Sequence, residues 1–325
     1  MKFWKPFLRS KGTVFAATAA LCLLAAVLSL ALGAAGMPLK ELVGSPIFFY
    51  VRLPRTCACL LAGAALAVAG AVIQGVLANR LASPNIIGVN AGAGLAVTVC
   101  CALGSFSGWV IAGSAFLGAL AAVALVTVLS RKVGASRSSV ILCGAAVNSF
   151  LSALSEAVTH LKPEIAFLST DFRIGGFSTV SHTRLIPAGI LILVGIAAVL
   201  ALCNELDVLT LGEETAHSLG LPVKKIRTLL LTLAALLAGA AVSFAGLLGF
   251  VGLLVPHAAR ALVGNESRNL LPLCALGGAG FVTVCDVAAR LALVPYELPV
   301  GILLSVLGAP FFALLLFRRN RRNAV

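Results

Sequence analysis

The sequence predicts an all-α, polytopic membrane protein with about ten transmembrane helices. Of its 325 residues 60% are hydrophobic and only 11% are charged, whereas a soluble domain is about half apolar and about a quarter charged. Long runs with almost no charge also follow one another along the chain. A run of about 18 or more apolar residues is a candidate transmembrane helix.

Ten apolar runs define the expected spans, whose ends a sequence locates only to within about four residues. They lie near residues 13–35, 56–77, 85–103, 109–130, 137–159, 185–203, 226–245, 247–263, 270–291 and 299–317. The first run is longer than the h-region of about 7–15 residues in a signal peptide, so we expect a retained span. The third and eighth runs are short and rich in glycine.

The basic residues predict the orientation of these spans. With the N-terminus inside, 17 of the 24 lysines and arginines fall on the cytoplasmic side, as the positive-inside rule requires. Both ends of the chain are basic, which calls for an even number of spans and cytoplasmic termini. The net charge of +13 is therefore assigned to loops beside membrane lipid, and no nucleic-acid partner is expected.

An internal similarity suggests an inverted repeat. Leu61–Gly70 reads LAGAALAVAG and Leu237–Gly246 reads LAGAAVSFAG, identical at seven of ten positions. They lie in spans two and seven, and a separation of five spans gives copies of opposite orientation, so spans 2–5 and 7–10 would correspond. Chance remains the alternative, because Ala, Leu and Gly dominate the chain.

The sequence carries no enzyme signature, and we expect a protein without catalytic residues, cofactor or bound metal. It contains no Gly-Lys pair, so it has no P-loop, and no HExxH motif. Its four histidines are far apart, and its nine cysteines lie almost entirely in apolar runs. Asp286 and Arg290 can pair at i, i+4. An ion-coupled carrier needs ionisable groups buried within its spans, and this chain has few of them. If the protein is a transporter, the energy for transport must therefore come from elsewhere.

One polar stretch, LTLGEETAHSLGLP at Leu209–Pro222, interrupts the apolar sequence. We expect Thr210 to cap a short helix with Glu213 and Glu214 in its first turn, near the positive end of the dipole. Gly220 would end it. A cytoplasmic helix of this kind suits docking on a soluble partner, although a plain solvated loop has the same composition.

Several motifs between residues 52 and 311 occur together in a fixed order. They are Arg52–Arg55 (RLPR), Gln74, Asn79–Gly88 (NRLASPNIIG), Leu211–Gly220 (LGEETAHSLG), Phe250–Arg260 (FVGLLVPHAAR), Asp286 with Ala289 and Arg290, Glu297–Gly301 (ELPVG) and Gly308–Phe311 (GAPF). With them the chain resembles the FecCD-like family of ABC importer permeases, which take up iron-siderophores, haem and vitamin B12. Two stretches depart from the family pattern. Asn79–Ala82 reads NRLA where Asn-Pro-Leu-Ala is usual. Phe172–Phe177, in the outer segment before the sixth span, also differs, so the resemblance does not decide the substrate.

The resemblance implies partners and a coupling site. Residues 1–325 would form one transmembrane permease domain, with residues 205–224 as its cytoplasmic coupling segment, in the bacterial cytoplasmic membrane. A second permease subunit, identical or similar, two cytoplasmic ABC ATPase subunits and an extracytoplasmic substrate-binding protein would complete the importer. The residues expected to couple to the ATPase are Leu211, Gly212, Glu213, Glu214, Ala216, Leu219 and Gly220.

Three outer arginines, Arg52, Arg55 and Arg290, are expected to form a basic rim that docks the binding protein, because an arginine can hold a carboxylate in bidentate fashion. Helix-end anchoring for the first two and an Asp286 pair for the third are the alternatives. The expected cargo is a metal chelate, first an iron-siderophore, then haem or a cobalamin. The rival class is an ion-coupled secondary transporter of the inverted-repeat type.

Overall fold

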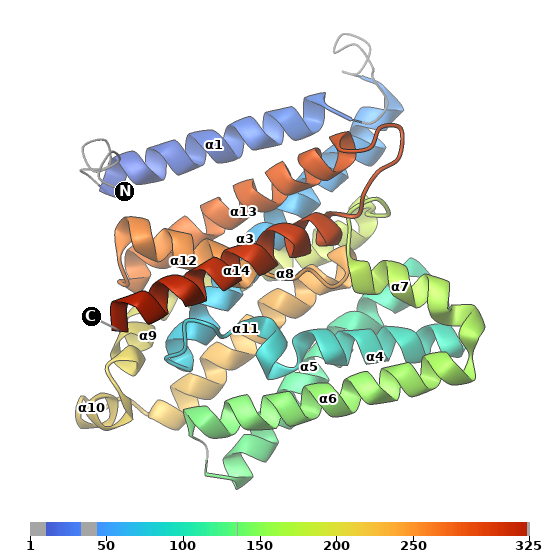
Figure 1. The fold of residues 1–325 in the computed structure, drawn as a ribbon. Coiled ribbons are helices and arrows are strands. Elements are labelled where there is room, and N and C mark those ends of the chain that lie inside the picture. The colour runs from blue at the N-terminus through green and yellow to red at the C-terminus, as the bar shows by residue number, and fades with distance from the viewer. Residues whose placement is uncertain (1–10, 34–43, 135, 324–325) are drawn as a thin grey trace.

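The computed structural model describes residues 11–33, 44–134 and 136–323, and most of these residues are helical (Figure 1). The helices are α1 (Lys11–Ala31), α3 (Leu53–Val76), α4 (Val89–Ala102), α5 (Gly108–Lys132), α6 (Arg137–Leu161), α7 (Ala166–Ile174), α8 (His182–Ala201), α9 (Cys203–Thr210), α10 (Glu213–Ser218), α11 (Val223–Ala245), α12 (Val251–Val263), α13 (Ser267–Leu291) and α14 (Val300–Asn323). A short π-helix, η1 (Phe48–Arg52), and two short 3₁₀-helices, η2 (Pro84–Ile87) and η3 (Pro163–Ile165), lie between them.

Ten helices of the described chain coincide with the ten expected spans, which confirms the fold class. Seven are long and apolar enough to cross a membrane, and α4, α12 and the apolar part of α14 are shorter. The third span is short because η2 and the left-handed Gly88 occupy its beginning. The eighth is short because Gly246 departs from helical backbone, so that the chain turns before α12 begins.

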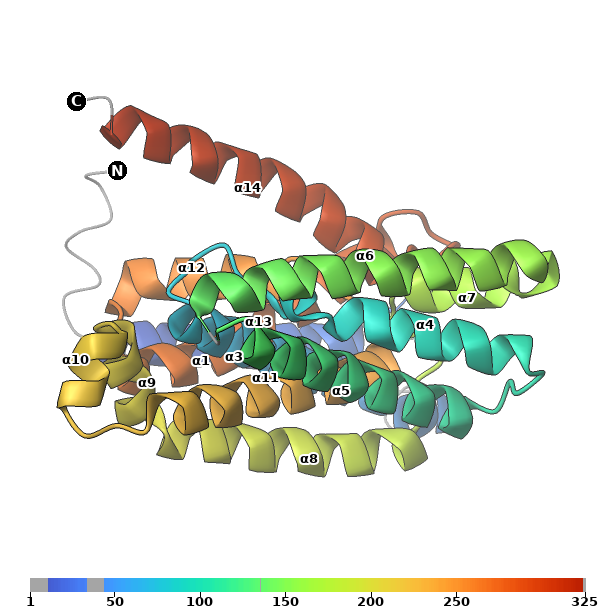
Figure 2. The same ribbon diagram turned by 90° about the horizontal axis from the view of Figure 1, so that it is seen from below.

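The centre of the bundle is built from α3, α11 and α13. In their most apolar windows 78%, 67% and 56% of residues are buried, against 22–28% for α1, α5, α6 and α8. The peripheral helices surround this core, with α8 and α14 on opposite sides in Figure 2. Small side chains explain the arrangement, since alanine and glycine let membrane helices approach closely.

Two pairs of glycines mark the closest approaches to α3. A Cβ atom at Gly63 would overlap the carbonyl oxygen of Gly278 in α13, and the reverse is also true. A Cβ atom at Gly70 would likewise overlap the carbonyl oxygen of Gly252 in α12. Larger side chains at these positions would push apart the helices that form the core.

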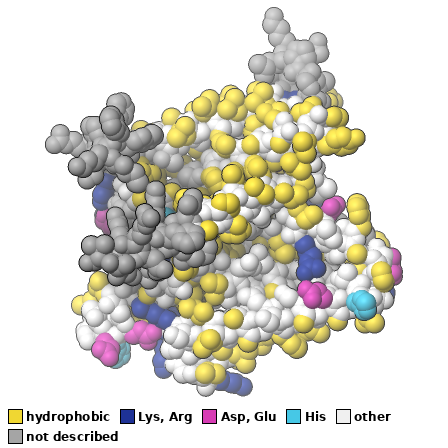
Figure 3. All heavy atoms as spheres, in the orientation of Figure 1, with side chains coloured by type: hydrophobic (Ala, Val, Ile, Leu, Met, Phe, Trp, Pro, Cys, Tyr) yellow, Lys and Arg dark blue, Asp and Glu magenta, His cyan; other side chains and the backbone are white. Residues whose placement is uncertain are grey.

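The outside of the described bundle is apolar over most of its length. Exposed leucines project from the peripheral helices, among them Leu21, Leu117, Leu142 and Leu193, and Figure 3 shows apolar side chains across the visible face. In water such a surface would be unfavourable, whereas hydrocarbon chains accommodate it without cost. The chain is therefore a multi-pass membrane protein.

Helix direction agrees with an even number of spans. The start of α1, the end of α14 and helix α10 lie at one end of the bundle (Figure 1); this end is called the α10 end below. Helices α3 and α11, which contain the two similar segments, pack together and run in opposite directions. Opposite direction is what an inverted repeat requires, and the repeat itself stays a prediction.

Candidate functional site

The polar stretch contains the last two residues of α9 and the whole of α10, at the α10 end. Thr210 is the last residue of α9, where its hydroxyl donates to the Asp207 carbonyl oxygen at 2.7 Å, so the expectation that it caps α10 is wrong. The break falls instead at Gly212, whose φ of +118° suits glycine because it has no Cβ. Gly220, with φ +81°, follows the helix as expected.

Helix α10 is braced against the core. The Arg227 side chain, 6% exposed, leads from α11 to an ion pair with Glu213. The α9 carboxylate of Asp207 accepts hydrogen bonds from the backbone N–H of Ser267 at 3.0 Å and from its hydroxyl, at the start of α13. Two of the three central helices therefore make direct polar contacts with the α9–α10 segment.

The residues expected to couple to an ATPase divide into two groups. Leu211 and Leu219 are 63% and 64% exposed, and Glu213 and Glu214 are also exposed. Ala216, in contrast, is completely buried. Its side chain therefore seats α10 on the protein, while the leucines and acidic groups present the outward surface.

The three outer arginines lie inside the protein at the opposite end of the bundle. Arg55 donates to Asp286 through Nε and Nη2, at 3.1 and 3.0 Å, and through Nη1 to Glu297 at 2.6 Å. Arg290 Nε also pairs with Asp286, at 3.0 Å from Oδ2. Arg52 donates to the carbonyl oxygens of the last turn of α1, at 2.6 and 2.9 Å.

This cluster, named the arginine network, joins α1, α3 and α13. Arg290 also donates to the Ser29 hydroxyl at 2.8 Å and to nearby carbonyls of α1. Positive groups at a helix C-terminus satisfy its free carbonyls and oppose its negative dipole end. The side chains of the network thus fasten the end of α1 to the core.

The burial of the three arginines contradicts the expectation that they form an exposed docking rim. Arg52, Arg55 and Arg290 are 5%, 8% and 3% exposed, so they do not form an exposed rim on this chain. Helix-end anchoring describes the contacts of Arg52, and the Asp286 pair is present for Arg290. Arg55 instead pairs with Asp286 and Glu297, which neither alternative named. The sequence did not show this because Asp286 and Arg55 are 231 positions apart.

A polar cavity of about 550 Å³ is lined by residues of η2, α4, α6, α7 and α14 and of the loop that precedes α12. Sequence reasoning missed its lining, which includes Asn85, Asn90, Asn148, Ser152, Ser155, Arg173 and Ser305. Asn148 donates to the Asn85 carbonyl at 2.6 Å. Its own Oδ1 is buried and has no hydrogen-bond donor among the described residues. The sequence feature that indicated this cavity was three asparagines, Asn85, Asn90 and Asn148, in otherwise apolar spans.

The described residues contain no group of three or more His, Cys, Asp or Glu side chains that could hold a metal ion. His257 lies in α12 against the Phe311 ring, with ring centroids 6.3 Å apart. Of the residues that line the cavity, Arg173 alone is charged. The cavity lining therefore suits a molecule that is recognised through hydrogen bonds.

An apolar exterior, a bundle of spans and a polar cavity define a membrane permease. The chain belongs to the FecCD transport family, whose match covers residues 21–318. It is thus the permease subunit of an ABC importer, and a separate subunit hydrolyses ATP. This assignment replaces the alternative of an ion-coupled secondary transporter.

Relatives match most of the chain. The Fe(3+)-citrate import permease YfmD of Bacillus subtilis is 39% identical over 83% of this chain and 81% of its own. The cobalamin import permease BtuC of Halobacterium salinarum is 38% identical over 84% and 73%. A solved inward-facing ABC transporter, assigned to the metal-chelate type, is 31% identical with a TM-score of 0.86, covering 95% of this chain and 99% of its own.

Proposed function

We propose that the chain carries a metal chelate, first an iron-siderophore, across the bacterial cytoplasmic membrane, driven by an ATPase that engages α10. Haem and cobalamin are the alternative cargoes. The observation that carries the proposal is the exposed surface of α10, braced to α11 and α13. The named relatives support the chelate class, since they import ferric citrate and cobalamin.

The contacts that hold α9 and α10 to α11 and α13 couple movement of a bound partner to these central helices. A partner that grips Leu211 and Leu219 moves α10 as a unit, because Ala216 and the Glu213–Arg227 pair leave it little freedom. The displacement passes to α11 through Arg227, while Asp207 and Ser267 link the adjoining α9 to α13. ATP-driven motion would thereby reach two central helices without any nucleotide site in the permease.

The polar cavity is proposed as one half of the translocation pathway, with a second permease subunit supplying the other half. A volume of about 550 Å³ is within the range of small-molecule sites, about 300–1,000 Å³. The free acceptor of Asn148 and the positive charge of Arg173 favour a neutral or anionic chelate. A bare cation would find few ligands there.

The α10 end is assigned to the cytoplasm, and the arginine network to the extracytoplasmic side. The basic residues beside α10, Lys224 and Lys225, follow the positive-inside rule. A substrate-binding protein would then approach the opposite end, where exposed groups other than the buried arginines must receive it.

The coupling proposal is tested with the Leu211→Asp, Leu219→Asp variant. We expect loss of ATPase co-purification and of ATP-driven uptake in vesicles, with normal membrane insertion. Leu103→Asp is the matched control, because Leu103 is 80% exposed in the loop between α4 and α5, at the other end of the bundle. Full ATPase association of the double variant would contradict docking at α10.

The substrate is tested by uptake in a strain that lacks the permease. The strain carrying this chain is offered a ferric siderophore, haemin and cobalamin in parallel, and iron-siderophore uptake is expected. Arg173→Gln should raise the KM for an anionic chelate, whereas Lys162→Gln, outside the cavity, should leave it unchanged. Uptake of cobalamin alone would overturn the iron assignment and leave the coupling proposal intact.

A further inference from the structure

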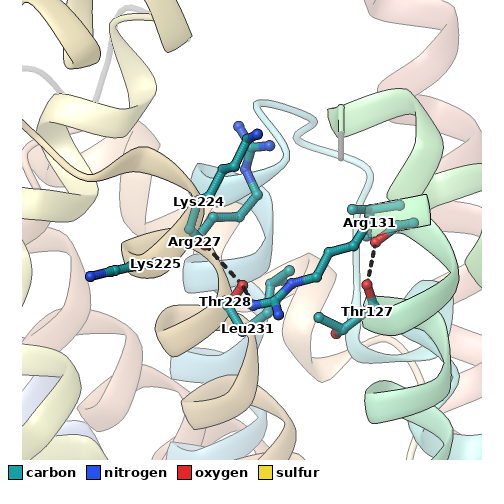
Figure 4. A pocket seen from close by; sticks show the side chains of 9 residues that line it. Thr127, Arg131, Lys224, Lys225, Arg227, Thr228 and Leu231 are labelled. Carbon is teal, nitrogen blue, oxygen red and sulfur yellow. Dashed lines mark hydrogen bonds between the residues drawn. The ribbon is translucent and has the colours of Figure 1, made fainter. Parts of the chain in front are cut away.

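A second pocket, of about 390 Å³, lies between α5, α6 and α11 at the α10 end. Its walls are the last turns of α5 with Thr127, Ser130 and Arg131, the side chain of Val140 in α6, and the first turns of α11 from Lys224 to Leu231. Figure 4 shows Arg131 reaching across to α11, where its guanidinium donates to the Thr228 hydroxyl at 2.9 Å. The pocket is separate from the polar cavity.

The lining of this pocket is strongly basic. Four of its nine lining residues are lysine or arginine and none is acidic. Arg227 is buried and paired with Glu213, which leaves the positive charges of Arg131, Lys224 and Lys225, all on exposed residues. The hydrogen bond from Arg131 to Thr228 orients its guanidinium and leaves its charge in place. The pocket therefore attracts an anion.

An apolar surface begins next to the pocket. On α5, Leu125, Val128 and Leu129 are 40%, 52% and 37% exposed, and on α11 Leu229 is 44% exposed. These residues stand within one or two helical turns of the basic groups on the same helices. Apolar side chains followed by basic ones at the end of a span are the pattern expected where hydrocarbon meets the headgroup layer of a membrane.

We propose that this pocket binds the phosphate of an anionic phospholipid headgroup, with the acyl chains lying against the apolar residues of α5 and α11. Basic pockets between transmembrane helices recognise such headgroups, and each nearby lysine or arginine contributes about a fivefold factor to binding. Free phosphate shares the headgroup chemistry, but the adjoining apolar surface favours the lipid. Binding needs neither the ATPase nor a transported substrate, so it is independent of the proposed function.

Native mass spectrometry of the purified full-length permease tests the proposal. The protein in detergent is titrated with phosphatidylglycerol and, in parallel, with phosphatidylcholine, which has no net charge. The Arg131→Gln, Lys224→Gln variant removes two charges from the pocket. Its matched control is Lys132→Gln, Arg268→Gln, which removes two exposed charges outside the pocket lining.

We expect wild type and control to prefer phosphatidylglycerol, and the pocket variant to bind it about 10- to 30-fold more weakly. The Arg131→Lys, Lys224→Arg variant should retain binding. If the double variant does not fold, Lys224→Gln alone, at an exposed position, should still lower binding by about fivefold. Equal losses in pocket variant and control, or no preference over phosphatidylcholine, would overturn the site. Displacement of the lipid by millimolar inorganic phosphate would identify free phosphate as the ligand and overturn the lipid assignment.

Discussion

Replacing Asp286 with asparagine should destabilise the permease by about 3 kcal/mol. Asp286 is 1% exposed and lies 3.0 Å from both the Arg55 and the Arg290 guanidinium. Removing one partner of a buried ion pair costs about 3–5 kcal/mol, because a charge is left without compensation. The lower value applies because Arg55 keeps Glu297 at 2.6 Å and Arg290 keeps carbonyl oxygens of α1.

The charges around Asp286 predict how its substitution couples to a substitution of Arg290. Without Asp286, the Arg55, Arg290 and Glu297 side chains sum to one positive charge, whereas Asp286→Asn with Arg290→Gln restores neutrality. The double variant should therefore be less destabilised than the sum of the single variants, with a coupling energy of about 1–3 kcal/mol.

The free energy of unfolding is measured in mixed detergent–SDS micelles by circular dichroism. The control is Glu156→Gln, an exposed carboxylate whose loss should change stability by less than about 0.5 kcal/mol. A cost below about 1 kcal/mol for Asp286→Asn, or strict additivity of the two substitutions, would show that the network does not stabilise the fold as argued.

Three further outcomes are expected. Gly63→Val should cost about 1–3 kcal/mol in the same unfolding assay, because its Cβ would overlap backbone of α13, while Gly113→Val, in open space, should be neutral. A hydrogen bond from Lys11 lowers the pKa of Glu266. The stability lost in Lys11→Ala should thus be measurable above pH 4.5, the usual pKa of the carboxyl group, and vanish as the pH falls through the lowered value. His257, which packs on an aromatic ring, should show no anomalous peak in crystals soaked with a transition metal, and a peak would give it a ligand role.

The sequence by itself determined the class, the ten spans and the short helix before α11. These features depend on local composition: about 18 apolar residues predict a span wherever they occur, and a glycine such as Gly220 ends a helix because of its own backbone freedom. The motif order from Arg52 to Phe311 likewise carried the family resemblance. Ala216 was correctly placed on α10, but its orientation was not visible in the sequence.

Tertiary structure decided which polar residues are buried. Arg52, Arg55 and Arg290 resemble exposed positive charges in the sequence, and only the approach of α1, α3 and α13 places them in an internal network. The burial of an ionisable side chain depends on its partners, because a buried charge is stable only when paired and hydrogen-bonded. Asn85 and Asn148 likewise meet through the packing of η2 against α6. Such contacts join residues far apart in the chain, and no local pattern specifies them.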